Sequence, residues 1–198
     1  MSTLEQFIHE VDFCGQVASA ANMLFRDLAA GDPAAFPFGE ARVEGFGTGA
    51  VRRKRKDLRI FEPAASGGRL ALCGEVKLPG TPEGRSAFDD RLYQDAAQKA
   101  DNAGVRFFFT WNVNEFVLWD RSQWEKPPLE RRVRAWKLGL TLASPEDVAR
   151  PENLDFIRTR FLPDLLRDLI DIIDECRLRG RNKCRRIRPC MLTNLILI

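Results

Sequence analysis

Three ionisable residues near the middle of the chain have the types and the spacing of a hydrolytic metal site. Asp57 precedes Glu75 by 18 positions, and Lys77 follows Glu75 by two. They lie on two runs of alternating apolar and polar residues, 57–62 and 69–78, which Ser66-Gly67-Gly68 joins. Turn glycines between two alternating runs predict a β-hairpin.

The hairpin brings the three side chains together in either of two registers. Glu75 and Lys77 share one face of their strand, about 6.6 Å apart along it. A turn centred on Ser66 sets Asp57 opposite Glu75, and a turn centred on Gly67 sets Asp57 opposite Lys77. Directly opposed residues share a face and lie about 5 Å apart between Cβ atoms. Either register therefore predicts two carboxylates and an ammonium at one place. The opposite face of the second run is expected to carry its apolar residues, Leu70, Leu72, Val76 and Leu78.

This grouping favours a divalent cation, because two carboxylates about 5 Å apart repel each other. Mg²⁺ prefers oxygen ligands and takes one or two carboxylates together with water and phosphate oxygens. The backbone carbonyl of Val76 lies beside both acids as a further ligand. Such a metal activates water and polarises a phosphodiester, and Mn²⁺ is expected to substitute for Mg²⁺. Lys77 would orient or deprotonate the water, or stabilise the negative charge at phosphorus. The sequence thus predicts metal-dependent hydrolysis of a nucleic-acid backbone.

A solvated ion pair is the alternative reading of any Glu-x-Lys on a strand, and it is the commoner one. Two features favour the catalytic reading here. Glu75-Val76-Lys77 is the only Asp/Glu-x-Lys in the chain, and an acid stands at the matching place on the partner strand.

The residues around this hairpin resemble the PD-(D/E)xK nuclease core, in the form found at the amino terminus of type I and type IIG restriction-modification enzymes. The motif segments are 55–60 and 72–77, and the similarity continues through 92–104 and 105–120. The resemblance implies an α/β fold with a restriction-endonuclease-like mixed β-sheet flanked by helices, Mg²⁺ dependence and double-stranded DNA as substrate. It implies Asp57 and Glu75 as metal ligands and Lys77 as the catalytic lysine, with Lys56 where the motif has proline.

The resemblance also draws attention to supporting residues. Many relatives carry Gln-x-x-x-Tyr on the next helix, whereas here Gln94 is followed at that spacing by Gln98. Both glutamines are therefore candidates for a supporting role. Some relatives add an acid from the first helix, and Glu5, Glu10 and Asp12 all remain open.

A run of five cations directly precedes Asp57 and is expected to bind the DNA backbone, since clustered Lys and Arg neutralise phosphates. Its members are Arg52, Arg53, Lys54, Arg55 and Lys56. Arg131, Arg132 and Arg134 form a second basic group without a decided role. The net charge of +3 is too small to identify a partner by itself.

Periodicity indicates the elements that carry these residues. An amphipathic helix is expected over 3–30, and a second helix between an N-cap at Ser86 and a C-cap at Gly104. The apolar run 105–110 predicts a buried strand, and 115–120 a strand nearer the sheet edge. The aromatic residues concentrated in this region are expected in the core rather than stacked on bases.

The chain divides into four expected parts. Residues 1–126 form the nuclease core, 127–143 a linker or short strand, 144–180 a helical connector, and 181–198 a basic and apolar tail of unknown status. The 198 residues with 44% hydrophobic content suit one α/β domain with a C-terminal helical extension.

The sequence also predicts the location and the partners of the protein. No run of about 18 apolar residues and no signal sequence is present, so we expect a cytoplasmic protein with no membrane span. Methyltransferase or specificity domains or subunits, absent from this chain, are expected partners, and an oligomer would supply two active sites for two strands. The alternative is a nuclease-fold module that binds DNA or assembles with partners without cutting.

Overall fold

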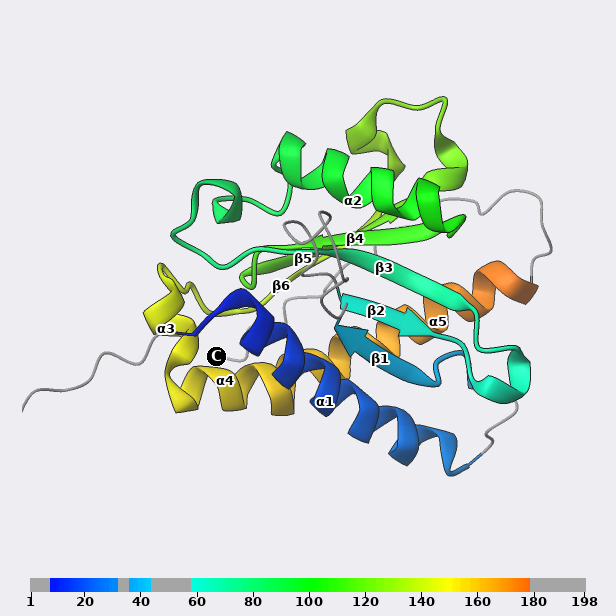
Figure 1. The fold of residues 1–198 in the computed structure, drawn as a ribbon, viewed down its shortest axis with the longest axis horizontal. Coiled ribbons are helices and arrows are strands. Elements are labelled where there is room, and N and C mark those ends of the chain that lie inside the picture. The colour runs from blue at the N-terminus through cyan, green and yellow to red at the C-terminus, as the bar shows by residue number, and fades with distance from the viewer. Residues whose placement is uncertain (1–7, 32–35, 44–57, 179–198) are drawn as a thin grey trace, which may run out of the picture.

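The computed structural model describes residues 8–31, 36–43 and 58–178. Its centre is a six-stranded mixed sheet with the strands in chain order from β1 to β6 (Figure 1). The strands are β1 (Glu40–Val43), β2 (Leu58–Phe61), β3 (Leu70–Val76), β4 (Phe107–Trp111), β5 (Glu115–Asp120) and β6 (Arg132–Lys137). The helices are α1 (Glu10–Ala29), α2 (Asp90–Ala103), α3 (Pro145–Ala149), α4 (Pro151–Phe156) and α5 (Leu162–Leu178), with a π-helical turn, η5 (Ile157–Phe161), between α4 and α5.

The sheet has one parallel pair, β3 with β4, and all its other neighbours are antiparallel. Parallel neighbours need a crossover connection, which α2 provides. Helix α2 covers one face of the sheet, while α1, α4 and α5 lie on the other (Figure 1). This arrangement confirms the predicted α/β class, the mixed sheet flanked by helices and the C-terminal helical extension.

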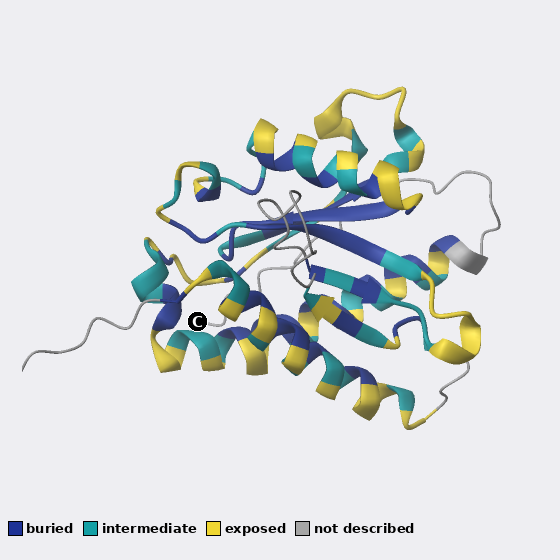
Figure 2. Ribbon diagram, in the orientation of Figure 1, coloured by how far each residue is buried: buried dark blue, intermediate teal, exposed yellow. Residues whose placement is uncertain are grey.

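Two apolar clusters, one on each face, hold the layers together (Figure 2). The larger joins α1 and α5 to the sheet, so that Phe13 and Leu165 are buried in the same cluster. The smaller lies under α2 and includes Cys73 and Trp119. The segment expected to be a helical connector thus shares its core with the sheet. The segment expected to be a linker or short strand contains β6, paired to β5.

The motif hairpin has the first of the two predicted registers. Leu58 pairs with Gly74 and Ile60 with Leu72, the ladder that a turn centred on Ser66 produces. The pairing then shifts, because Phe61 pairs with Leu70 and leaves Ala71 as an extra residue. A bulge of this kind reverses the alternation of side chains.

Leu70 accordingly packs against the cluster under α2, and Ala71 packs against the larger cluster. The prediction that Leu70 shares a face with Leu72 is therefore wrong, whereas Leu72, Val76 and Leu78 do lie in one cluster.

Helix α2 begins later than predicted and ends where predicted. Its N-cap is Asp89, whose Oδ1 accepts from the backbone N–H groups of Arg91 and Leu92 at 2.9 and 3.1 Å. Ser86 instead accepts from the Phe88 N–H in the preceding turn at 3.0 Å. Gly104 caps the other end with φ of 66°, a left-handed conformation that glycine adopts without strain.

Strand β5 lies nearer the sheet edge than β4, as predicted, and β6 pairs along it and forms the outer strand. Three of the six residues of β6 are exposed and charged, so this strand lacks an apolar run such as that of β4. The aromatic residues expected in the core are buried, apart from Trp124, which is 68% exposed in the β5–β6 connection; the buried ones are Phe107, Phe108, Phe109, Trp111, Phe116 and Trp119. Among the described residues, no helix is both long enough and apolar enough to cross a membrane.

Candidate functional site

Glu75 and Lys77 lie at the carboxyl end of β3, in the middle of the sheet. Glu75 is only 4% exposed, and it shares its face of the strand with Cys73, which is buried under α2. Lys77 comes directly after the strand, and its backbone N–H still donates to the Trp111 carbonyl of β4 at 2.8 Å. Two strands therefore fix the backbone that carries both side chains.

Three carboxylates surround the ammonium of Lys77. Its Nζ lies 3.4 Å from Glu10 Oε1, 3.8 Å from Glu83 Oε2 and 3.9 Å from Glu75 Oε2. Glu10 stands in the first turn of α1, and Glu83 in the short 3₁₀ turn η2 (Pro82–Gly84). Of the acids that sequence analysis left open in the first helix, the structure brings Glu10 to Lys77.

The loop after Lys77 turns back sharply enough to return Glu83 to the site. A Cβ on Gly84 would lie 1.9 Å from the Leu78 carbonyl oxygen, so only glycine fits there. The loop is further tied by Thr81, whose hydroxyl donates to the same carbonyl at 2.7 Å. This turn brings Glu83 to the site. The distance between Glu83 and Lys77 in the sequence did not predict their contact.

Lys99 of α2 is a second residue of this cluster that sequence analysis did not identify. Its Nζ forms an ion pair with Glu75 Oε1. The helix buries Ala96 and Ala100 toward the sheet, and Lys99 stands beside them on the flank of that face. The sequence signal for this contact was the helical period, which places Lys99 beside the buried face of the helix that covers Glu75.

The described part of the site carries three carboxylates, from Glu10, Glu75 and Glu83, against the two ammonium groups of Lys77 and Lys99. Within the described residues, no three or more His, Cys, Asp or Glu side chains are grouped so that they could hold a metal ion. Mg²⁺ commonly takes only one or two protein carboxylates, with water and phosphate completing its shell. Three carboxylates against two ammonium groups leave one net negative charge, and carboxylate oxygens are ligands of the kind that Mg²⁺ takes.

The carbonyl of Val76 points toward β2, away from β4. Successive residues of a strand direct their backbone groups to opposite sides, and the Lys77 N–H is directed at β4. On the β2 side, the described ladder ends where Leu58 pairs with Gly74. Asp57 and the cations at 52–56 directly precede Leu58 and lie outside the described residues.

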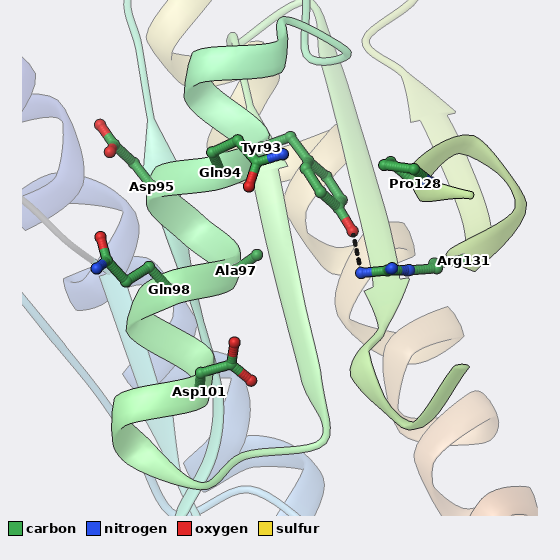
Figure 3. A pocket seen from close by; sticks show the side chains of 8 residues that line it. All are labelled: Tyr93, Gln94, Asp95, Ala97, Gln98, Asp101, Pro128 and Arg131. Atoms are coloured by element: carbon green, nitrogen blue, oxygen red, sulfur yellow. Dashed lines mark hydrogen bonds between the residues drawn. The ribbon is translucent and has the colours of Figure 1, made fainter. Parts of the chain in front are cut away.

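Gln94 and Gln98 are exposed and line a groove of about 500 Å³ on the outer side of α2. Tyr93 and Arg131 point toward each other across it, while Asp95 and Gln98 extend away from Arg131 (Figure 3). Neither Glu75 nor Lys77 lines this groove. The residue of α2 that contacts Glu75 is Lys99.

The second basic group is engaged within the fold. Arg131 donates to the Tyr93 hydroxyl at 3.2 Å and to the Trp124 carbonyl at 2.5 Å. Arg132 lies over the Phe88 ring at 5.7 Å, and Arg134 pairs with Asp168 at 2.7 Å. These contacts give each arginine a structural role.

No family model, curated protein or solved structure matches this chain. The cluster at the end of β3 is therefore the basis for a functional assignment.

Proposed function

We propose that this protein is a Mg²⁺-dependent endonuclease that hydrolyses phosphodiester bonds in double-stranded DNA. The observation that supports it is the convergence of Glu75, Lys77 and Glu10 at the end of β3, with Glu75 buried. Gathering several carboxylates costs free energy through their mutual repulsion, and such clusters are typical of sites that bind cations or carry out chemistry.

Asp57 completes the proposed site through its position in the chain. Leu58 pairs with Gly74; Asp57 directly precedes Leu58 in the chain, and Glu75 directly follows Gly74. Consecutive Cα atoms are about 3.8 Å apart, and the same register extended by one residue would set Asp57 opposite Glu75. We propose that these two carboxylates and the Val76 carbonyl hold Mg²⁺, for which Mn²⁺ substitutes.

The residues of the site have distinct roles in this proposal. When bound, Mg²⁺ lowers the pKa of a coordinated water and polarises the scissile phosphate. Lys77 orients or deprotonates that water, or stabilises the negative charge at phosphorus. Glu10 and Glu83, at 3.4 and 3.8 Å from the Lys77 ammonium, position it between the strand and the loop.

The basic run at 52–56 supports DNA as the substrate, because it directly precedes Asp57 and carries five positive charges. Backbone contacts carry no base information, so sequence selection would come from methyltransferase or specificity partners of a cytoplasmic restriction-modification or phage-defence system. An oligomer would supply the second active site needed to cut both strands.

One observation favours a second candidate. Both oxygens of Glu75 face an ammonium, Oε1 that of Lys99 and Oε2 that of Lys77 at 3.9 Å. A carboxylate neutralised in this way suits a nuclease-fold module that binds DNA or assembles with partners without cutting.

Cleavage of supercoiled plasmid separates the two candidates. The full chain is incubated with Mg²⁺, Mn²⁺ or EDTA, beside the variants Lys77→Ala and Asp57→Asn. Lys126→Ala is the control, since Lys126 is an exposed lysine in the β5–β6 connection. We expect metal-dependent nicking or linearisation by the wild type and the control only, with DNA binding and circular dichroism unchanged in all four proteins.

A Lys77→Ala protein that cuts as fast as the wild type would show that the proposed site is wrong. DNA binding without cleavage by any of the proteins would favour the non-catalytic module.

A further inference from the structure

We propose that Lys99 is a built-in counter-ion that competes with the divalent cation for the Glu75 carboxylate. By this competition it sets the metal concentration that the site requires. The inference rests on the proposed function, because it takes Glu75 as a ligand of the metal.

The contact between the two residues is close and sheltered from solvent. Lys99 Nζ pairs with Glu75 Oε1, and the two side chains are 26% and 6% exposed. A buried carboxylate is costly unless a cation or several hydrogen-bond donors accompany it. In the metal-free protein, Lys99 contributes this compensating charge.

Lys77 holds Glu75 less tightly than Lys99 does. Its ammonium is shared among three carboxylates, at 3.4 Å from Glu10 and 3.8 and 3.9 Å from Glu83 and Glu75. The charge of Lys77 is therefore shared by three acids, whereas Lys99 donates a hydrogen bond directly to Oε1 of Glu75. A metal that binds that oxygen must displace the Lys99 ammonium.

The fold allows this displacement without movement of the helix. The backbone of Lys99 is fixed in α2, which has caps at both ends, Asp89 and Gly104. Its side chain is a flexible four-carbon stem that ends in a compact charge. The ammonium can therefore leave Glu75 by side-chain rotation, and the Lys99 side chain is already 26% exposed to solvent.

Removal of this charge has two opposite consequences. Without metal, Lys99→Met leaves the buried carboxylate of Glu75 without its close counter-ion, so the melting temperature should fall by roughly 6–15 °C. With metal, the competing cation is gone, so the dissociation constant for Mg²⁺ or Ca²⁺ should fall about tenfold. Divalent cations should then raise the melting temperature of Lys99→Met more than that of the wild type, because they bind the folded variant more tightly.

A second buried ion pair provides the matched control. Asp120 is 1% exposed. Arg106 donates two hydrogen bonds to its carboxylate, from Nε to Oδ1 at 3.1 Å and from Nη2 to Oδ2 at 2.9 Å. Arg106→Met also removes the cation of a buried carboxylate. In the described residues, Asp120 accepts hydrogen bonds from Arg106, Ser122 and Gln123, and neither Lys77 nor Lys99 is among these donors.

Thermal unfolding of the full chain is measured in EDTA and in increasing Mg²⁺ or Ca²⁺, with isothermal titration calorimetry of the same metals. We expect both variants to melt below the wild type in EDTA. Added metal should raise the melting temperature of Lys99→Met more than that of the wild type, and that of Arg106→Met by the same amount as the wild type. Lys99→Arg, which keeps the charge, should behave as the wild type. If Lys99→Met does not fold, Lys99→Gln is used, because it removes the charge and keeps a hydrogen-bond donor.

Equal effects of metal on the Lys99 and Arg106 variants would overturn the competition and leave Lys99 a structural residue. Plasmid cleavage by the wild type separates this failure from a failure of the proposed function. Cleavage without metal rescue of the Lys99 variant overturns the competition alone. Metal rescue in a protein that never cuts DNA supports the competition and rejects the nuclease.

Discussion

The ammonium of Lys77 lies 3.4 Å from the carboxylate of Glu10, although 67 positions separate the two residues in the chain. The first turn of α1 and the end of β3 therefore meet at one site. The Glu10 side chain is 10% exposed and that of Lys77 is 20% exposed, so solvent screens this pair only partly.

Glu10→Gln tests whether this contact positions Lys77 for chemistry. The substitution keeps the size of the side chain and removes the charge beside the ammonium. We expect plasmid cleavage to slow by roughly 10- to 100-fold, the usual range for residues that orient the groups around a metal. The control is Asp12→Asn, because Asp12 stands in the same helical turn and is exposed. Equal cleavage rates for the two variants would show that Glu10 does not position Lys77 for cleavage.

The basic run before Asp57 is tested by the salt dependence of DNA binding. Replacing both Arg52 and Arg53 with alanine should lower the slope of log K against log[salt] by about 2, since each phosphate neutralised contributes roughly 0.9. The measurement is fluorescence anisotropy with a short duplex between 50 and 200 mM salt, conditions in which such slopes are well determined. Arg150→Ala with Arg158→Ala is the control, because both arginines are exposed, one on each side of α4. An unchanged slope in the Arg52 and Arg53 variant would place these residues away from the DNA.

Gly74 is required by the packing of β3 against β4. A Cβ at this position would lie 2.2 Å from the Phe109 carbonyl oxygen and 2.5 Å from its ring. Gly74→Ala should therefore lower the free energy of unfolding by about 1–3 kcal/mol or prevent folding, since backbone has to move. Gly15→Ala in α1 is the matched control, because no atom lies within 4 Å of the added Cβ. There alanine should stabilise by about 0.5–1 kcal/mol, as measured by urea unfolding. Equal effects at the two positions would contradict the observed packing.

Asp120 gives the fold a predictable sensitivity to acid. Burial alone would raise the pKa of its carboxyl, but hydrogen bonds from Arg106 and Ser122 outweigh burial and hold the pKa below its usual value. A depressed folded-state pKa contributes stability that is present above the unfolded value of about 3.9 and is lost as the pH falls through the folded value. Acid should therefore weaken the wild type below about pH 4 through this group.

Asp120→Asn isolates that contribution. At pH 7 we expect it to lower the free energy of unfolding by about 1.5–3 kcal/mol, the range for hydrogen bonds to a charged group. The difference from the wild type should shrink as the pH falls below about 4, where the wild-type carboxyl also becomes neutral. Urea unfolding of both proteins from pH 7 to acid measures it. A difference that does not change with pH would assign the effect to packing.

Local sequence determined the parts of this protein that depend on neighbours in the chain. The hairpin, the placement of Glu75 and Lys77 on one face, and the end of α2 at Gly104 follow from strand alternation and from glycine conformations. The amphipathic period of α1 and the apolar run of β4 were also sufficient to predict those elements. Sequence did not choose between the two hairpin registers, because either one satisfies the same alternation.

Tertiary structure decided which side chains meet. The bulge at Ala71 and the place of β6 at the sheet edge arise from strand pairing, which apolar patterning does not encode. Glu10, Glu83 and Lys99 come to Glu75 and Lys77 from three separate elements. The sequence left Glu10 as one of three candidate acids and placed Lys99 beside the buried face of its helix, but it did not show that either residue meets Glu75 or Lys77. These contacts depend on how α1 and α2 pack on opposite faces of the sheet. A strand fixes its own side chains by its period of two, whereas only the packed layers fix the distance between an acid on a helix and a lysine on a strand.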